Sequence, residues 1–202
     1  MEERIRRKYW YRRPDHDGII SRVEWSLDGK FDWTDGPALV ETDDQGERLL
    51  EEWYFSGKLS RDDGPARIVR FASMVTEEWY SYGRLRRFGG PARTIFNEQT
   101  EVYELEEWVI DDLRHRMDGP ALIHREEDGQ VTHEAHYREG VLHRTDGPTI
   151  ISTDPETGVV VAEEWYEEGV FIEDRSVYRD PATGQQVSKT APPGSGSPPE
   201  PS

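Results

Sequence analysis

The chain has no cysteine, and no apolar run among its 202 residues approaches the roughly 20 residues of a membrane-spanning helix. The missing cysteines exclude disulfides and thiolate chemistry, so the composition gives no sign of an oxidising compartment. The basic residues 1–8 are not followed by an apolar segment, as they would be in a secretory leader. We therefore expect a cytoplasmic protein without a membrane span.

Helical periodicity is also missing from the sequence. Gly or Pro interrupts every window long enough for a helix, and each costs about 1 to 3 kcal/mol inside one. β-Branched and aromatic residues bounded by Gly and Pro, as in residues 66–71, 94–96 and 149–151, are typical of short strands. The sequence therefore predicts an all-β protein.

What the chain has in abundance is one repeated phrase, an aromatic residue followed eleven residues later by Gly-Pro. Successive copies are 28, 26, 29, 28 and 29 residues apart, which is typical of a repeat array. The copies begin at Trp25, Trp53, Trp79, Trp108, His136 and Trp165, and the last of them lacks Gly-Pro. We predict an elongated antiparallel β-meander of about six repeated hairpin units, with the indole rings stacked as a ladder along one face.

Two kinds of turn recur along the array. A Gly stands four residues after the repeat aromatic, replaced once by Asp112. Asp-Gly-Pro follows later in the first five units, with Gly89 once in place of the Asp. We expect the residue at the first turn to adopt a left-handed backbone, and we expect the same of the Gly in Gly-Pro.

The sequence divides into three segments. Residues 1–20 form a basic N-terminal cap or half repeat, and residues 21–185 form the repeat array. Residues 186–202 are rich in Pro, Gly and Ser, so we expect a disordered tail. The basic start is interpreted as an edge strand or as a segment folded on the acidic body, in preference to a nucleic-acid contact.

The unit Glu-Trp-Tyr-x-x-Gly-x-Leu-x-Arg-x-Asp-Gly-Pro-Ala resembles the MORN repeat and its bacterial and phage variants, over roughly residues 20–180. The period here is longer, and Gly-Pro stands where MORN units have Gly-x-Gly. The resemblance implies an elongated sheet of hairpins used for protein association and sometimes for lipid contact. MORN-like repeats also occur in antitoxin-like proteins, which implies a toxin-neutralising or host–phage setting.

The charge is strongly negative and unevenly spread. The chain carries −17, with +4 on residues 1–13, −1 on residues 180–202 and therefore −20 on the body between them. Such a body repels nucleic-acid phosphates and anionic lipid, and it favours a basic partner.

Two columns of Glu precede the repeat aromatics, and a column of Arg follows them by eight residues, at Arg61, Arg87, Arg116 and Arg144. One interpretation is that Glu and Arg interleave as cross-strand ion pairs. The other is an acidic stripe that docks a basic surface, with tryptophans as anchors. The candidate protein-binding residues are Glu51, Glu52, Glu77, Glu78, Glu106, Glu107, Glu163, Glu164, Trp53, Trp79, Trp108 and Trp165.

Histidines supply the candidates for chemistry. His115 and His143 each precede an Asp by three residues, but their slot recurs in other units with other residues, which argues against catalysis. A hairpin turn at residues 128–129 would bring His124 near His133, with His136 nearby, although charge flanking a turn explains this cluster equally well. We expect no catalytic residue, no metal, no cofactor and no small-molecule substrate.

The sequence thus favours a non-enzymatic acidic β-repeat scaffold that binds a basic protein partner, with an immunity or antitoxin-like protein or a phage inhibitor as the setting. The alternative is a nucleic-acid mimic that inhibits a DNA- or RNA-binding protein, since direct binding of nucleic acid is disfavoured. A third hypothesis is an enzyme or metal protein centred on His115, His143 or His133.

Overall fold

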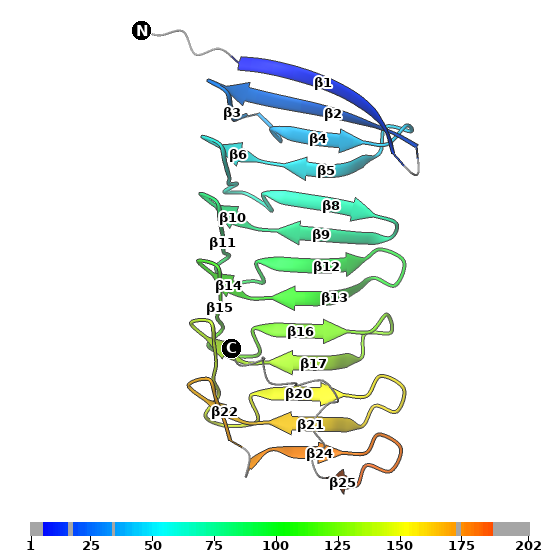
Figure 1. Cartoon of the computed structure of the whole chain (residues 1–202), viewed down its shortest axis with the longest axis vertical. Helices are drawn as coiled ribbons and strands as arrows, with labels where there is room; N and C mark the ends of the chain where they lie inside the picture. Colours follow the sequence, from blue (N-terminus) through cyan, green and yellow to red (C-terminus); the bar gives the residue numbers. More distant parts are fainter. Residues whose placement is uncertain (1–5, 16–17, 34, 173–174, 188–202) are drawn as a thin grey trace, which may run out of the picture.

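The computed structural model describes residues 6–15, 18–33, 35–172 and 175–187. These residues form a long antiparallel meander whose main strands pair in chain order, with short hairpins between them (Figure 1). The predicted elongated β-meander of repeated hairpins is confirmed. No helix in the described residues is long and apolar enough to cross a membrane.

The main strands are stacked in chain order from the N-terminal to the C-terminal end (Figure 1). They are β1 (Arg6–Asp15), β2 (Gly18–Leu27), β4 (Leu39–Thr42), β5 (Arg48–Glu52), β8 (Arg67–Phe71), β9 (Met74–Glu78), β12 (Arg93–Asn97), β13 (Val102–Glu107), β16 (Leu122–Arg125), β17 (Val131–Ala135), β20 (Ile150–Thr153), β21 (Val160–Glu164), β24 (Val177–Arg179) and β25 (Gln186–Val187).

A short hairpin follows each repeat aromatic and forms a second column beside the sheet, on the left in Figure 1. In the first unit β3 (Lys30–Phe31) pairs back on β2. The other hairpins are β6 (Tyr54–Phe55) with β7 (Lys58–Leu59), β10 (Tyr80–Ser81) with β11 (Arg84–Leu85), β14 (Val109–Ile110) with β15 (Leu113–Arg114), β18 (Tyr137–Arg138) with β19 (Val141–Leu142), and β22 (Tyr166–Glu167) with β23 (Val170–Phe171).

The hairpin turns have two residues with positive φ, the arrangement that matches the twist of a tight antiparallel hairpin. Ser56 and Gly57 have φ of 50° and 78°, and Asp111 and Asp112 have φ of 51° and 69°. The expected left-handed backbone, including the Asp112 substitution, is confirmed. The turn amides also join neighbouring hairpins, since Gly83 N–H donates to the Leu59 carbonyl at 2.7 Å.

The core is narrow and centred on the buried small residue that follows each Gly-Pro, an Ala in four units and Thr149 in the fifth. Ala66 is fully buried, and its amide and carbonyl bind the strands on either side, with Ala66 N–H donating to Glu78 O and Trp53 N–H donating to Ala66 O, both at 2.8 Å. Leu85, Ala92 and Val109 form an apolar cluster between sheet and hairpins. Burial in this fold therefore depends on contacts between neighbouring units, as in other repeat arrays.

The main sheet also includes strands in the two flanking segments of the sequence. β1 pairs with β2 from Arg6–Leu27 to Asp15–Gly18, so most of the predicted cap is the first strand pair of the sheet. β25 pairs with β24 as far as Val187. Residues 188–202, nearly all of the predicted tail, lie outside the described residues.

Candidate functional site

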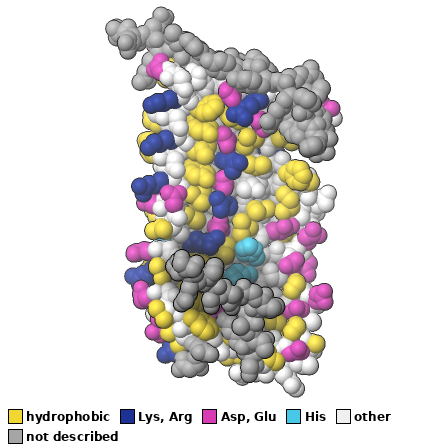
Figure 2. All heavy atoms as spheres, in the orientation of Figure 1, with side chains coloured by type: hydrophobic (Ala, Val, Ile, Leu, Met, Phe, Trp, Pro, Cys, Tyr) yellow, Lys and Arg dark blue, Asp and Glu magenta, His cyan; other side chains and the backbone are white. Residues whose placement is uncertain are grey.

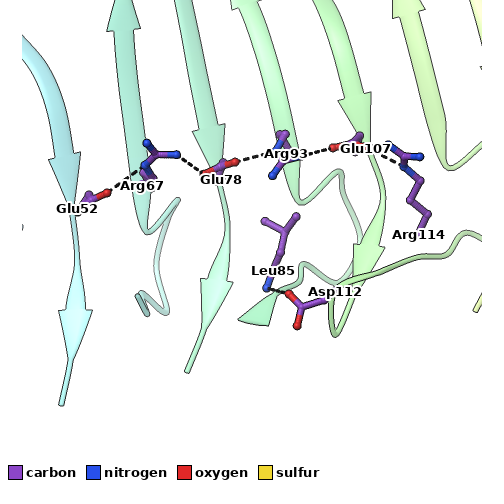
Figure 3. A network of polar contacts seen from close by, with 8 residues as sticks. All are labelled: Glu52, Arg67, Glu78, Leu85, Arg93, Glu107, Asp112 and Arg114. Carbon is purple, nitrogen blue, oxygen red and sulfur yellow. Dashed lines mark hydrogen bonds and ion pairs between the residues drawn. The ribbon is translucent and has the colours of Figure 1, made fainter. Parts of the chain in front are cut away.

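The Glu column directly before the repeat aromatics forms a continuous row of ion pairs across the centre of the sheet (Figure 3). Arg67 Nε lies 3.0 Å from Glu52, and its Nη1 lies 3.1 Å from Glu78. Arg93 makes the next two links, at 2.7 Å to Glu78 and 2.8 Å to Glu107. Arg114, from the hairpin column, closes the row on Glu107 with its Nε at 2.9 Å. We call these six residues, Glu52, Arg67, Glu78, Arg93, Glu107 and Arg114, the charged row.

The carboxylates of the charged row are largely withdrawn from solvent. Glu78 and Glu107 are 5% and 4% exposed, whereas the side chains of Arg67 and Arg93 are 38% and 35% exposed. An alternating column of basic and acidic side chains runs down the face seen in Figure 2. A tyrosine follows four of the six repeat aromatics, and the first of these, Tyr54, donates its hydroxyl to Glu52 at 2.9 Å. Burial and that carboxylate raise the pKa of Tyr54.

The second Glu column, two residues before the aromatics, is also largely paired. Buried Glu51 accepts from Arg48 and Arg70, the latter at 2.9 Å. Glu106 pairs with Arg125 and Glu163 with Arg179, both at 2.6 Å. Within the described part of the chain, Glu77 and Glu134 form no ion pair.

Glu164 and the tryptophans complete the predicted protein-binding set. Glu164 accepts hydroxyl hydrogens from Tyr166 at 3.2 Å and Tyr178 at 2.8 Å. Trp53, Trp79, Trp108 and Trp165 are half-buried. The predicted residues therefore lie at equivalent places in successive units, but intramolecular partners occupy most of their carboxylates.

The Arg column that one interpretation paired with the Glu columns has a different partner, so that interpretation was wrong for these arginines. Each guanidinium lies on the indole eight residues before it: Cζ is 4.1 Å from the Trp53 ring centre for Arg61, 4.0 Å from Trp79 for Arg87 and 3.9 Å from Trp108 for Arg116. These are cation–π distances. Arg61 also binds Asp63 at 2.7 Å, which lowers the pKa of that carboxyl.

The same stack corrects the predicted ladder of indoles. An Arg side chain and a Gly-Pro separate the indole of one unit from the aromatic of the next, as at the groove lined by Arg61, Gly64, Pro65 and Trp79. The guanidinium also donates to the carbonyl of that proline, at 3.4 Å for Arg61 and Pro65. Each indole is therefore an anchor for its own unit.

The Gly of Gly-Pro serves this stack, and the positive φ predicted for it was wrong. Gly64, Gly90, Gly119 and Gly147 are absent from the residues with positive φ. A Cβ at Gly64 would lie 2.9 Å from Arg61 Cζ, and one at Gly147 would lie 2.7 Å from Arg144 Cζ. The glycine is needed because the guanidinium packs flat against its backbone, which explains the constant spacing of eleven residues.

The slot of His115 and His143 links one hairpin to the next. His115 Nδ1 accepts from Glu139 N–H at 3.1 Å, just as Ser60 Oγ accepts from Tyr82 N–H at 3.1 Å in an earlier unit. His143 Nδ1 lies 3.3 Å from Glu168 in the following hairpin. This recurrence favours a structural function for both histidines.

The hairpin predicted to bring His124 opposite His133 is present. The two residues are register partners, and their ring centres are 5.8 Å apart. His136 lies elsewhere, with Nε2 3.1 Å from Arg144 Nη1, and burial together with that cation lowers its pKa to about 4. No group of three or more His, Cys, Asp or Glu in the described ranges is placed to hold a metal ion.

Sequence reasoning missed a set of exposed carboxylates without ion pairs. They lie on the turns joining successive main strands, along the right-hand edge in Figure 1, and acidic side chains gather there in the lower half of Figure 2. We call them the turn-edge carboxylates; all are exposed and lack ion pairs among the described residues: Asp44, Glu47, Glu98, Glu101, Glu126, Glu127, Asp128 and Glu156. Their signal in the sequence was the acidic composition of the segments that join one unit to the next, such as residues 43–47 and 126–128.

Comparison of the chain with models of known families, with curated proteins and with solved structures gave no match.

Proposed function

We propose that this protein is a non-enzymatic, cytoplasmic β-repeat scaffold that binds a basic protein partner along its turn edge. The observation that supports this is the distribution of ion pairs. Most arginines of the array are bound within the sheet and the loops, to the charged row, to Glu51, Glu106 and Glu163, and to the Asp of Asp-Gly-Pro. The surplus of carboxylates is therefore concentrated on the turn edge, where it has no neutralising partner within the described residues.

The sheet would hold these carboxylates in a regular row. Successive turns are two strands apart, which corresponds to about 9 to 10 Å along the edge. Fixed charges of one sign raise the local concentration of an oppositely charged partner and accelerate its association. The MORN resemblance suggests an immunity or antitoxin-like protein, or a phage inhibitor, as the setting.

The test begins with affinity purification from the source cell, followed by identification of the bound protein by mass spectrometry. Association rates are then measured at low and high salt for the wild type and for Glu126→Gln/Glu127→Gln. We expect the wild-type rate to fall steeply with salt and the variant to associate several-fold more slowly. Asp28→Asn/Glu139→Gln removes the same charge from the hairpin column and should leave the rate nearly unchanged.

A rate insensitive to salt and to both variants would contradict the proposal. Nucleic-acid mimicry gives a different outcome, because duplex DNA should then displace the captured protein.

A further inference from the structure

Aromatic residues that the repeat does not require occur near the N-terminal end of the array. Trp33 stands in the slot that Arg61, Arg87, Arg116 and Arg144 fill in later units, eight residues after the repeat aromatic. It packs on Trp25 with ring centres 5.6 Å apart, so an aromatic ring replaces the usual guanidinium.

Phe55 and Tyr82 are the next two departures. They stand two and three residues after their repeat tryptophans, at positions that hold Ser81 and Ser56 in each other's units. Their rings meet edge to face at 5.9 Å, yet the residues remain 51% and 63% exposed. Because serine satisfies the fold at both positions, packing does not explain the aromatic choice.

These departures converge on one groove of about 560 Å³. We call it the aromatic groove, and its rings belong to Trp33, Trp53, Tyr54, Phe55 and Tyr82. It lies between the Gly-Pro loop of the first unit and the hairpin of the second.

The charge of the aromatic groove is negative. Asp35, Asp62 and Asp63 line it, against a single arginine, Arg61. That guanidinium already lies over Trp53 and binds Asp63. Asp62 is exposed and has no ion pair in the described part of the chain.

Corresponding grooves further along the array have a different lining. The groove at Trp79 contains three arginines, Arg61, Arg86 and Arg87, and the groove at His136 also contains three, Arg116, Arg138 and Arg144. Clustered aromatic rings and surplus carboxylate thus coincide in the aromatic groove and not in these two.

We propose that the aromatic groove binds a protonated lysine or arginine side chain of a protein partner. Aromatic faces attract a cation, and a nearby carboxylate accepts its hydrogen bonds. This inference rests on the proposed function, because it identifies the group of a basic partner that one part of the scaffold receives.

The first test uses N-acetylated tripeptide amides Gly-Lys-Gly and Gly-Arg-Gly as probes, with acetyl-lysine and citrulline versions as neutral controls. The indole N–H signals of Trp33 and Trp53 are followed by NMR. We expect the charged probes to shift these two signals, to leave those of Trp108 and Trp165 in place, and to bind about fivefold more tightly than the neutral probes.

Variants that borrow residues from other units separate recognition from folding. Phe55→Ser/Tyr82→Ser should weaken binding of the charged probes about fivefold or more while leaving the circular dichroism spectrum unchanged. Asp62→Asn should weaken it less. Phe88→Asp removes an exposed aromatic from the neighbouring groove and should have no effect. Equal binding of charged and neutral probes, or full binding by Phe55→Ser/Tyr82→Ser, overturns the proposal.

The two proposals can fail separately. If an identified basic partner binds Phe55→Ser/Tyr82→Ser as tightly as the wild type, the groove assignment is overturned and the scaffold function stands. If the probes bind the groove but no basic partner responds to the turn-edge variant, the scaffold function is overturned and cation recognition by the groove stands.

Discussion

The central units and the fifth unit, around His136, build the same architecture from different side chains. In the centre, register partners across the sheet are Glu52, Arg67, Glu78, Arg93 and Glu107. In the fifth unit the same row continues through Leu122, Ala135 and Ile150 before it reaches Glu164. The backbone pairing of the strands therefore stays the same at the point where apolar residues replace the charged ones.

The aromatic stack varies in the same way. His136 replaces the indole, and Arg144 binds its Nε2 at 3.1 Å instead of lying on a larger ring. Gly147 still accommodates the guanidinium, and Arg144 still donates to Pro148 O at 3.1 Å. The contact between Arg and Gly-Pro is therefore common to these units, whereas the row and the ring are exchangeable.

The largest effect is expected where a charged set is broken. Glu78→Ala leaves Arg67 and Arg93 with one carboxylate each, and since both are more than a third exposed, water offsets part of the loss. We expect a loss of about 2 to 3 kcal/mol in the free energy of unfolding, measured by urea denaturation. Glu164→Ala, at the equivalent position where two tyrosines donate, should cost about 1 kcal/mol. Equal losses would contradict the distinction between a carboxylate bound by two arginines and one that accepts from two tyrosines.

The next effect tests the contact that the units share. Gly119→Ala places a Cβ 3.0 Å from Arg116 Cζ, and we expect a loss of about 1 to 3 kcal/mol in unfolding free energy. Gly36→Ala is the matched control, because its Cβ would meet Trp33 at an ordinary 3.6 Å. In a double-mutant cycle, Gly119→Ala should cost less in the background of Arg116→Ala than in the wild type, because the guanidinium that the new Cβ meets is gone. An equal loss in both glycine variants would show that the guanidinium is not the cause.

Much of this fold could be predicted from local signals. The fixed period, the β-branched segments and the Gly four residues after each aromatic determine strands and hairpin turns through backbone preferences. The identity of the Glu partners could not be predicted, because Arg67 and Arg93 reach Glu78 only through the register of three strands. The turn edge was missed for the same reason, since a surplus carboxylate is recognised only after the paired ones are known.

The Arg stack was missed because its contact spans the β6–β7 hairpin, which brings Arg61 back over Trp53. Spacing alone placed Arg61 on a strand opposite a Glu. The aromatic groove had a sequence signal, since aligning the units puts Trp33 in the Arg slot, but its aromatic neighbours come from two further units.

A smaller effect distinguishes His136 from the indoles of other units. Its pKa is lowered to about 4 by burial and by Arg144, whereas an unfolded histidine has a pKa near 6.5. The unfolded chain therefore binds more protons between these values. Stability from the neutral ring is fully present above about pH 6.5 and is lost as pH falls toward about 4.

Because the ring is only half-buried, we expect this loss to be about 1 to 2 kcal/mol in unfolding free energy measured across that range. His136→Gln retains a hydrogen-bonding group without the titration and should lose correspondingly less. If the unfolding free energies of the wild type and of His136→Gln change in parallel with pH, the pH dependence comes from other groups.

The smallest effect is expected where the apolar register partners of the fifth unit are all exchanged for a paired set of charged residues. Leu122→Arg/Ala135→Glu/Ile150→Arg would extend the charged row from Glu107 to Glu164 through existing register partners. Replacing an apolar set by a fully paired charged one is close to neutral, so we expect a change below about 1 kcal/mol in unfolding free energy. Leu122→Arg/Ile150→Arg without the new Glu lacks the central carboxylate and should lose about 2 kcal/mol. If the triple variant is as unstable as the double, the row depends on features of the central units besides charge pairing, and the two regions are not interchangeable.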